Sequence, residues 1–241
     1  MKKMKIVVAL VSLAFAASSA SAAWAPASGW TSVDPWQFTY APESGHWYGL
    51  SVVGLWGDAQ TDAVQAGNAV SASSAISGAW IGSLVKIDDA DENAWLRDTF
   101  FDDDGAGPDT VPGLNGKLGQ NEWGDIPHLW IGATAFAPKD VSDPDQWNWN
   151  DGSPLSAGYT NWGGGEPSAH PQEQWAAIRQ DAGGTWNNYE TSIWFDSYGY
   201  GNIQGIIELT PVTSSIPAPG AFLIAGIGSA CVGFLRRRKA V

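Results

Sequence analysis

The sequence is poor in cysteine and histidine. Cys231 is the single cysteine among 241 residues, so the chain cannot be stapled by an internal disulfide. Histidine occurs only as His46, His128 and His170, and neither the G-x-S-x-G nor the H-E-x-x-H motif is present. These absences argue against an enzyme. We expect buried apolar side chains, each contributing about 1.5–3 kcal/mol, to stabilise the chain instead of a disulfide.

Basic residues are also scarce, and the chain has a formal net charge of −13. Between Trp24 and Thr210 there are 25 acidic and five basic residues, a net charge of −20. Nucleic acid and acidic polymers are therefore not expected as partners. Divalent cations and neutral ligands remain compatible with this charge.

The first 22 residues have the features of a secretory signal peptide. Three lysines precede an apolar run from Ile6 to Ala17, and Ala20-Ser21-Ala22 provides a small-residue cleavage pattern. We expect residues 1–22 to be removed and the protein to be exported, with residues 23–44 forming an extended lead into the first strand.

Residues 211–241 begin with a polar linker that leads into a second apolar segment. Pro217-Ala218-Pro219-Gly220 precedes an apolar run from Ala221 to Leu235, which ends at Arg236-Arg237-Arg238-Lys239. Counted from Pro217, the segment has about 19 residues, near the minimum for a membrane span, and the basic cluster would stay cytoplasmic. The arrangement resembles a PEP-CTERM sorting tail, with Ala218 in place of the usual glutamate. That resemblance implies an exosortase-type processing enzyme as a partner, a membrane-anchored stage and a final place at the cell surface or outside the cell.

The stretch from Gln146 to Asn188 predicts a long irregular loop. It contains five of the fifteen tryptophans, mixed with glycine, proline and carboxylates. Long loops inside compact domains are uncommon and often functional. Oxygen ligands suited to calcium occur at Glu166 with Ser168, at Glu173, and at the pair Asn187 and Asn188. Solvated loop residues are the alternative interpretation.

Several motifs in this stretch resemble the long-loop region of a C-type lectin-like domain. They are W-x-W-x-D-G-x-P from Trp147, Y-x-N-W from Tyr159, E-P-x from Glu166 and W-N-N from Trp186. Flanking segments match in the same order: Gly45–Tyr48, Ser83–Leu96, Leu129–Gly132 and Gly205–Leu209. The likeness covers about 165 residues and implies a lectin-like domain at 45–210.

The expected fold is α+β, C-type lectin-like, with two helices, short antiparallel strands and the long loop. The pattern predicts strands at 46–55 and 83–87. A helix is expected at 58–71, capped by Asp58, and a second from Asp89 and Glu92 through Phe100. The segment 101–128 is an insertion whose acidic cluster at 102–109 lacks the spacing of an EF-hand loop.

The resemblance implies a calcium site made by Glu166, Glu173, Asn187 and Asn188, with Glu166–Pro167 in the cis form. Ser168 and Asn188 replace the family's asparagine and aspartate, which leaves two carboxylates where sugar-binding members have three. Lower charge predicts weaker affinity, in the range of about 10⁻⁴ to 10⁻³ M. The ligand-binding candidates are Glu166, Ser168, Glu173, Asn187, Asn188 and Trp186, with Trp186, Trp162 or Trp194 able to stack on a sugar ring.

Two functions remain open from the sequence. One is a surface-sorted bacterial C-type lectin-like protein that binds carbohydrate or exopolysaccharide, with calcium as its cofactor. The other is an adhesion or matrix module that contacts protein partners through the same fold without metal or sugar. Glu166 and Glu173 could also serve as a glycosidase pair, but no other feature of the sequence supports that reaction.

Overall fold

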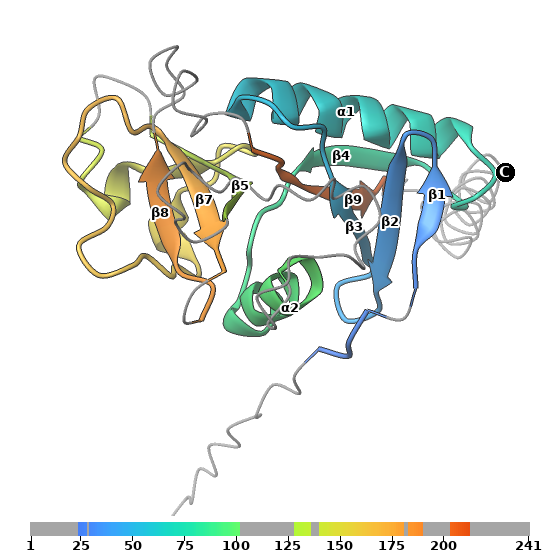
Figure 1. Ribbon diagram of the computed structural model, residues 1–241, viewed down its shortest axis with the longest axis horizontal. Coiled ribbons are helices and arrows are strands. Elements are labelled where there is room, and N and C mark those ends of the chain that lie inside the picture. The colour runs from blue at the N-terminus through green and yellow to red at the C-terminus, as the bar shows by residue number, and fades with distance from the viewer. Residues whose placement is uncertain are drawn as a thin grey trace, which may run out of the picture.

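The computed structural model describes residues 24–27, 29–101, 128–135, 140–180, 183–189 and 203–212. Two α-helices and two antiparallel sheets make up this part of the chain. The first sheet lies between the helices, and the second forms a separate lobe with the long loop (Figure 1). The expected α+β, C-type lectin-like fold is therefore confirmed by the order and pairing of its elements.

The first sheet has five strands in the order β1-β2-β3-β9-β4. Their bounds are β1 Thr31–Val33, β2 Trp36–Ala41, β3 His46–Leu50, β4 Trp80–Leu84 and β9 Ile206–Pro211. The last strand, β9, lies between β3 and β4, pairing Leu209 with both Trp47 and Gly82. Strand β9 thus joins one sheet with four strands from the first part of the chain.

Strands β1 and β2 lie within the segment that was expected to be an extended lead. Phe38 pairs with Gly49 of β3 and is fully buried. Trp36 is also buried and donates its indole N–H to Asp62 in α1 at 2.9 Å. The segment is therefore part of the sheet and the core.

Helix α1 (Trp56–Ala72) covers one face of the first sheet. Its alanine-rich inner side packs on β4, where Gly67 and Gly82 approach so closely that neither has room for a Cβ atom. The helix begins two residues before the predicted start. Leu55 occupies the N-cap position, and Asp58, the predicted cap, instead accepts a hydrogen bond from the Leu55 amide at 3.3 Å.

Helix α2 (Ala90–Phe100) lies on the opposite face of the same sheet (Figure 1). Asp89 caps it as predicted, because its carboxylate accepts from the Glu92 amide at 2.8 Å. Glu92 does not complete the capping box. It turns inward, where it accepts from the Tyr48 hydroxyl at 2.7 Å and from the Asp88 amide at 2.8 Å.

The second sheet has four strands in the order β6-β5-β7-β8. Its strands are β5 His128–Thr134, β6 Asn148–Trp149, β7 Trp175–Arg179 and β8 Trp186–Tyr189. Strand β5 is buried along its whole length. Two short 3₁₀ helices, η1 (Pro144–Gln146) and η2 (Leu155–Ala157), lie with β6 between β5 and β7. The stretch from Gln146 to Asn188, predicted to be one irregular loop, also contains β7 and most of β8, so the irregular long loop is confined to the segment before β7.

Aromatic side chains fill the main core. Trp147 and Trp186 are fully buried, and Trp149 contacts Trp186 with the ring centroids 5.7 Å apart. Trp95 of α2 packs against both Tyr48 and Trp24, at 5.1 and 5.7 Å between centroids. No cysteine occurs in the described ranges, so burial of these rings holds this part of the chain together without a disulfide.

Several sequence predictions concern residues outside the described ranges. They are the signal peptide at 1–22, the acidic cluster at 102–109, Trp194, and the apolar segment and basic cluster between 217 and 239. Among the residues that the structure does describe, no helix combines the length and apolar character needed to cross a membrane.

Candidate functional site

The long loop is fastened to β8 by main-chain hydrogen bonds. The Trp186 amide donates to Asn161 O at 2.7 Å, and the Gly163 amide donates to Trp186 O at 2.9 Å. Trp162 packs edge-on against Trp147 at 4.9 Å and against Trp186 at 5.9 Å between centroids. These contacts place Glu166 directly beside β8.

The structure brings the predicted site residues together. Glu166, Ser168 and Glu173 come from the loop, while Asn187 and Asn188 come from β8. The Ser168 hydroxyl donates to the Glu173 carboxylate. The Glu166–Pro167 peptide bond is cis, as the resemblance implies. All five residues therefore belong to one cluster at the edge of the second sheet.

Asn187 and Glu166 form the central pair of this cluster. With its amide nitrogen toward Glu166, Asn187 donates to Oε1 at 2.6 Å and to Oε2 at 3.2 Å. A rotation of the amide by 180° brings its oxygen there instead, so that three acceptor oxygens face one another. A cation is the partner that such a set of oxygens attracts.

Charge repulsion between Glu166 and Glu173 also favours a bound cation. Partial burial raises the pKa of Glu166, and the neighbouring Glu173 carboxylate raises it further. Arg179 of β7 acts in the opposite direction and lowers the Glu166 pKa. No motif in the sequence marks Arg179, which is the last residue of β7. A bound divalent cation would relieve the remaining repulsion between the two carboxylates.

Asn188 has a structural role that the sequence did not indicate. Its side chain is buried, accepts from the Ser168 amide at 2.8 Å, and donates to Ser168 O at 3.2 Å and to Glu173 O at 3.1 Å. The Asn188 side chain thus holds the loop against β8 through these hydrogen bonds. Because the Asn188 side chain is buried and its three hydrogen bonds bind it to the loop backbone, we leave Asn188 out of the candidate calcium shell.

The prediction that Trp186 contacts a ligand is wrong. The side chain is fully buried, and its indole N–H donates to Asn93 Oδ1 of α2 at 2.7 Å. The alternation of β8 explains both corrections, because Trp186 and Asn188 point inward while Asn187 and Tyr189 are partly exposed. That two-residue period is visible in the sequence W-N-N-Y. Trp162 is partly buried in the same aromatic group.

The residues present fit calcium in part. Glu166, Glu173 and the Asn187 amide supply side-chain oxygens, and calcium completes a shell of about six to eight with carbonyls, water or ligand hydroxyls. Within the described ranges, no group of three or more histidine, cysteine or acidic side chains is arranged to hold a metal. The site therefore has the charge of a weak calcium site and lacks that of a strong one.

The chain is similar to C-type lectin proteins in short and distant comparisons. No protein-family model matches it. A stretch of 65 residues, 27% of the chain, is 35% identical to C-type mannose receptor 2 of both Mus musculus and Rattus norvegicus. The chain spans only 4% of the length of these receptors.

Two solved structures extend the comparison. The C-type lectin CEL-I from Cucumaria echinata is 22% identical, with a TM-score of 0.44 over 68% of this chain and 90% of that one. A calcium-independent type II antifreeze protein is 14% identical, with a TM-score of 0.42 over 79% and 98%. At these scores, the fold assignment rests on the strands, helices and loop described above.

Proposed function

We propose that this chain is an exported bacterial surface protein whose C-type lectin-like domain binds a neutral carbohydrate or exopolysaccharide, with weakly held calcium as cofactor. One observation carries the proposal. The partly exposed side chains of Glu166, Glu173 and Asn187 lie close together where the long loop packs against β8. Calcium held there would offer its open positions to sugar hydroxyls. We assign the protein a binding role and not a catalytic one.

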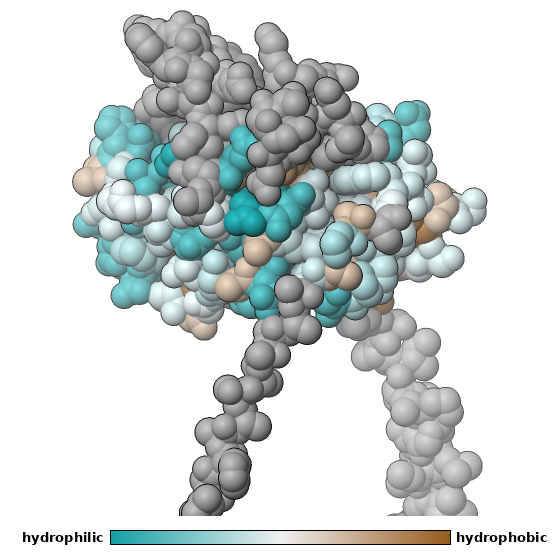
Figure 2. All heavy atoms as spheres, turned by 60° about the horizontal axis from the view of Figure 1, so that its bottom comes forward, coloured by the Kyte–Doolittle hydropathy of each residue, from teal (hydrophilic) through white to brown (hydrophobic). Residues whose placement is uncertain are grey.

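The chemistry of the surroundings supports a polar, uncharged ligand. Carboxylate and amide groups accept and donate hydrogen bonds to hydroxyls, and the strongly negative chain would repel an acidic polymer. The described part of the surface shown in Figure 2 is mostly hydrophilic, with small and separate apolar spots. A polysaccharide matrix matches these properties.

Delivery to the cell surface is part of the proposal. The signal peptide at 1–22 would direct export, and the segment at 211–241 would hold the protein in the membrane until an exosortase-type enzyme processes it. The domain would then face the polysaccharide outside the cell.

An adhesion or matrix module without metal or sugar is the second candidate. Hydrogen bonds within the cluster favour this candidate. The Ser168 hydroxyl donates to the Glu173 carboxylate, and the Asn188 side chain is hydrogen-bonded to the loop backbone. A cluster that satisfies its own hydrogen bonds can stabilise the loop for contact with protein partners. The two candidates make different predictions about calcium.

The test compares the melting temperature of the full chain, kept soluble in mild detergent, in millimolar calcium and in chelator. Calcium at about 100 times its Kd stabilises the folded state by about 2.7 kcal/mol, which raises the melting temperature by several degrees. The shift should disappear in Glu166→Gln/Glu173→Gln. Asp145→Asn is the matched control, because Asp145 is an exposed carboxylate of the same lobe.

Binding to immobilised neutral polysaccharide completes the test. Retention in calcium, lost in chelator and in the double variant but kept in Asp145→Asn, supports the lectin. Coincident melting curves with no retention overturn the proposal and favour the matrix module. Retention that survives in chelator and in the double variant places the sugar site elsewhere on the protein.

A further inference from the structure

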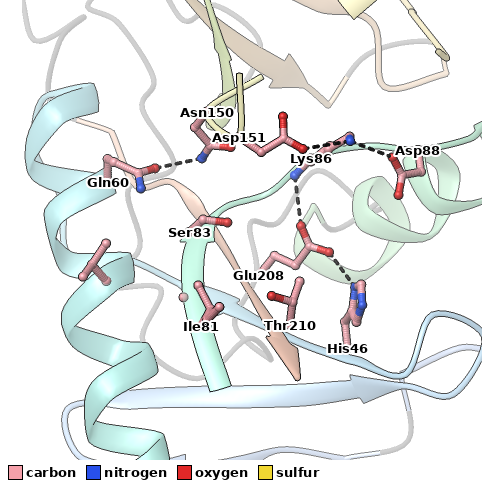
Figure 3. Close-up of a pocket in the computed structure, with 12 residues that line it drawn as sticks. His46, Gln60, Ile81, Ser83, Lys86, Asp88, Asn150, Asp151, Glu208 and Thr210 are labelled. Carbon is pink, nitrogen blue, oxygen red and sulfur yellow. Dashed lines mark hydrogen bonds and ion pairs between the residues drawn. The ribbon is translucent and has the colours of Figure 1, made fainter. Parts of the chain in front are cut away.

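A pocket lies away from the long-loop cluster, at the edge of the first sheet that β4 forms. It has a volume of about 510 Å³, within the range of roughly 300–1,000 Å³ for small-molecule sites. Strands β4 and β9 form its floor, α1 contributes one wall, and the turn after β6 contributes another (Figure 3). No part of the proposed lectin site lines it.

The floor follows from the pairing of the two strands. Ile81 pairs with Thr210 and Ser83 pairs with Glu208, so the four side chains project from the same face of the sheet. Ser83 and Thr210 are partly exposed, and neither hydroxyl has a hydrogen-bond partner in the described part of the chain. Two hydroxyl groups, placed diagonally across the β4–β9 pair, are therefore available to a ligand.

The walls are fixed by hydrogen bonds. Gln60 of α1 uses its amide oxygen to accept from the Leu84 amide at 3.1 Å and from Asn150 Nδ2 at 3.0 Å. The Gln60 amide nitrogen and the Asn150 carbonyl oxygen remain for other partners. Val64 and Ile81, 47% and 57% exposed, add an apolar surface beside these polar groups.

The charged groups around the pocket are paired with one another. Lys86 Nζ lies 3.0 Å from Asp151 and 3.8 Å from Asp88, and Figure 3 shows it bridging the two. His46 Nδ1 lies 2.6 Å from Glu208 Oε1, while Glu208 Oε2 accepts from the Lys86 amide at 3.1 Å. Because three carboxylates share one lysine and one histidine, the pocket keeps a small surplus of negative charge and offers little attraction to an anionic ligand.

We propose that this pocket is a second, calcium-independent binding site for a neutral hydroxylated ligand of the size of a disaccharide. Hydroxyl and amide groups on the floor and one wall bond the ligand hydroxyls, and Val64 and Ile81 contact its C–H face. The proposal does not depend on the long-loop site. It concerns different residues and requires no metal.

The experiment measures saturation-transfer NMR of maltose, cellobiose, lactose and chitobiose with the full chain in detergent and excess chelator, which silences any calcium site. Binding of at least one disaccharide is expected, weakened about tenfold or more in Ser83→Ala/Thr210→Val, since each lost hydrogen bond contributes about 1 kcal/mol. These two substitutions remove the hydroxyls and nearly preserve side-chain volume.

Two controls make the result specific. Thr31→Val/Ser74→Ala removes two hydroxyls at positions outside the pocket and should bind normally. Glu166→Gln/Glu173→Gln should also bind normally in chelator, which separates this site from the proposed lectin site. The proposal is overturned if none of the four disaccharides binds, or if Ser83→Ala/Thr210→Val binds as well as the control.

Discussion

Gly67 of α1 and Gly82 of β4 meet backbone to backbone, and the helix rests on the first sheet at this contact. A Cβ atom on Gly82 would collide with the Ala63 carbonyl oxygen, and a Cβ atom on Gly67 would collide with the Gly82 amide. Both obstacles are main-chain atoms, which cannot rotate away as a side chain can. The separation of helix and sheet is therefore set by the absence of two side chains.

Gly82→Ala should destabilise the protein by about 1–3 kcal/mol or more, because α1 must move away from β4. Chemical denaturation of the full chain measures this difference. Gly57→Ala is the matched control in the same helix, where a Cβ atom meets nothing within 4 Å. That control should be neutral or stabilising by about 0.5–1 kcal/mol. Equal stability of the two variants would contradict the close contact.

Stability should fall as pH rises from about 5 to 9. Burial, with the nearby Glu208 charge, raises the pKa of Glu92 from 4.5 to about 8. Glu92 therefore stabilises the fold fully below about pH 4.5, and this contribution is lost by about pH 8. The hydrogen bond to Glu208 raises the pKa of His46 above 6.5, so its contribution is likewise lost at higher pH.

Thermal melts across this pH range measure the effect. Glu92→Gln mimics the protonated acid and should flatten most of the pH dependence, because an amide carries no charge to desolvate at this buried position and its carbonyl oxygen can still accept from the Tyr48 hydroxyl. Asp98→Asn, at a mostly exposed carboxylate of the same helix, should leave the slope unchanged. A wild-type melting temperature that is constant or rises from pH 5 to 9 would sink this prediction.

Asn188 and Asn187 should respond differently to truncation, although they are neighbours. Asn188→Ala removes three hydrogen bonds to Ser168 and Glu173, and we expect a loss of about 2 kcal/mol together with faster hydrogen exchange at the Ser168 amide. Asn187→Ala should leave stability nearly unchanged and weaken calcium binding. Similar effects of the two variants on both measurements would argue against the division of roles.

Trp186→Phe should lower stability by about 1–3 kcal/mol, because it removes core volume and the bond from the indole to Asn93. Polysaccharide retention per folded molecule should not change, since the ring is fully buried. Denaturation and retention are measured on the same preparation. Reduced retention with unchanged stability would restore Trp186 to the ligand surface.

Local signals made some elements predictable from the sequence and left others hidden. Asp89 was a reliable cap because its hydrogen bond to Glu92 involves a residue only three positions away. The first helix was predicted two residues late because Leu55 gives no capping signal. Strand β2 lies in a tryptophan- and proline-rich segment that has no strand pattern of its own. It is held in place by pairing with β3 and by the hydrogen bond from Trp36 to Asp62, and neither partner can be inferred from the segment itself.

The candidate site was predictable in its composition and less so in its geometry. The resemblance gathered Glu166, Ser168, Glu173 and Asn187 correctly into one cluster. It could not show that Asn188 is turned inward, since that depends on which face of β8 is buried. The pocket over Ser83 and Thr210 had no sequence signal at all, because it arises from the pairing of distant strands.

The central position of β9 has a mechanical consequence. The strand begins beside the end of β4, where the Val85 amide donates to Ile206 O, and ends at Pro211 beside Trp80. Strand β9 is hydrogen-bonded to β3 on one side and to β4 on the other, and these hydrogen bonds are perpendicular to the strand axis. A pull on Pro211 against a grip on the long loop would load both ladders in shear, so that many hydrogen bonds resist together. The domain should therefore resist tension applied between its long loop and the end of β9.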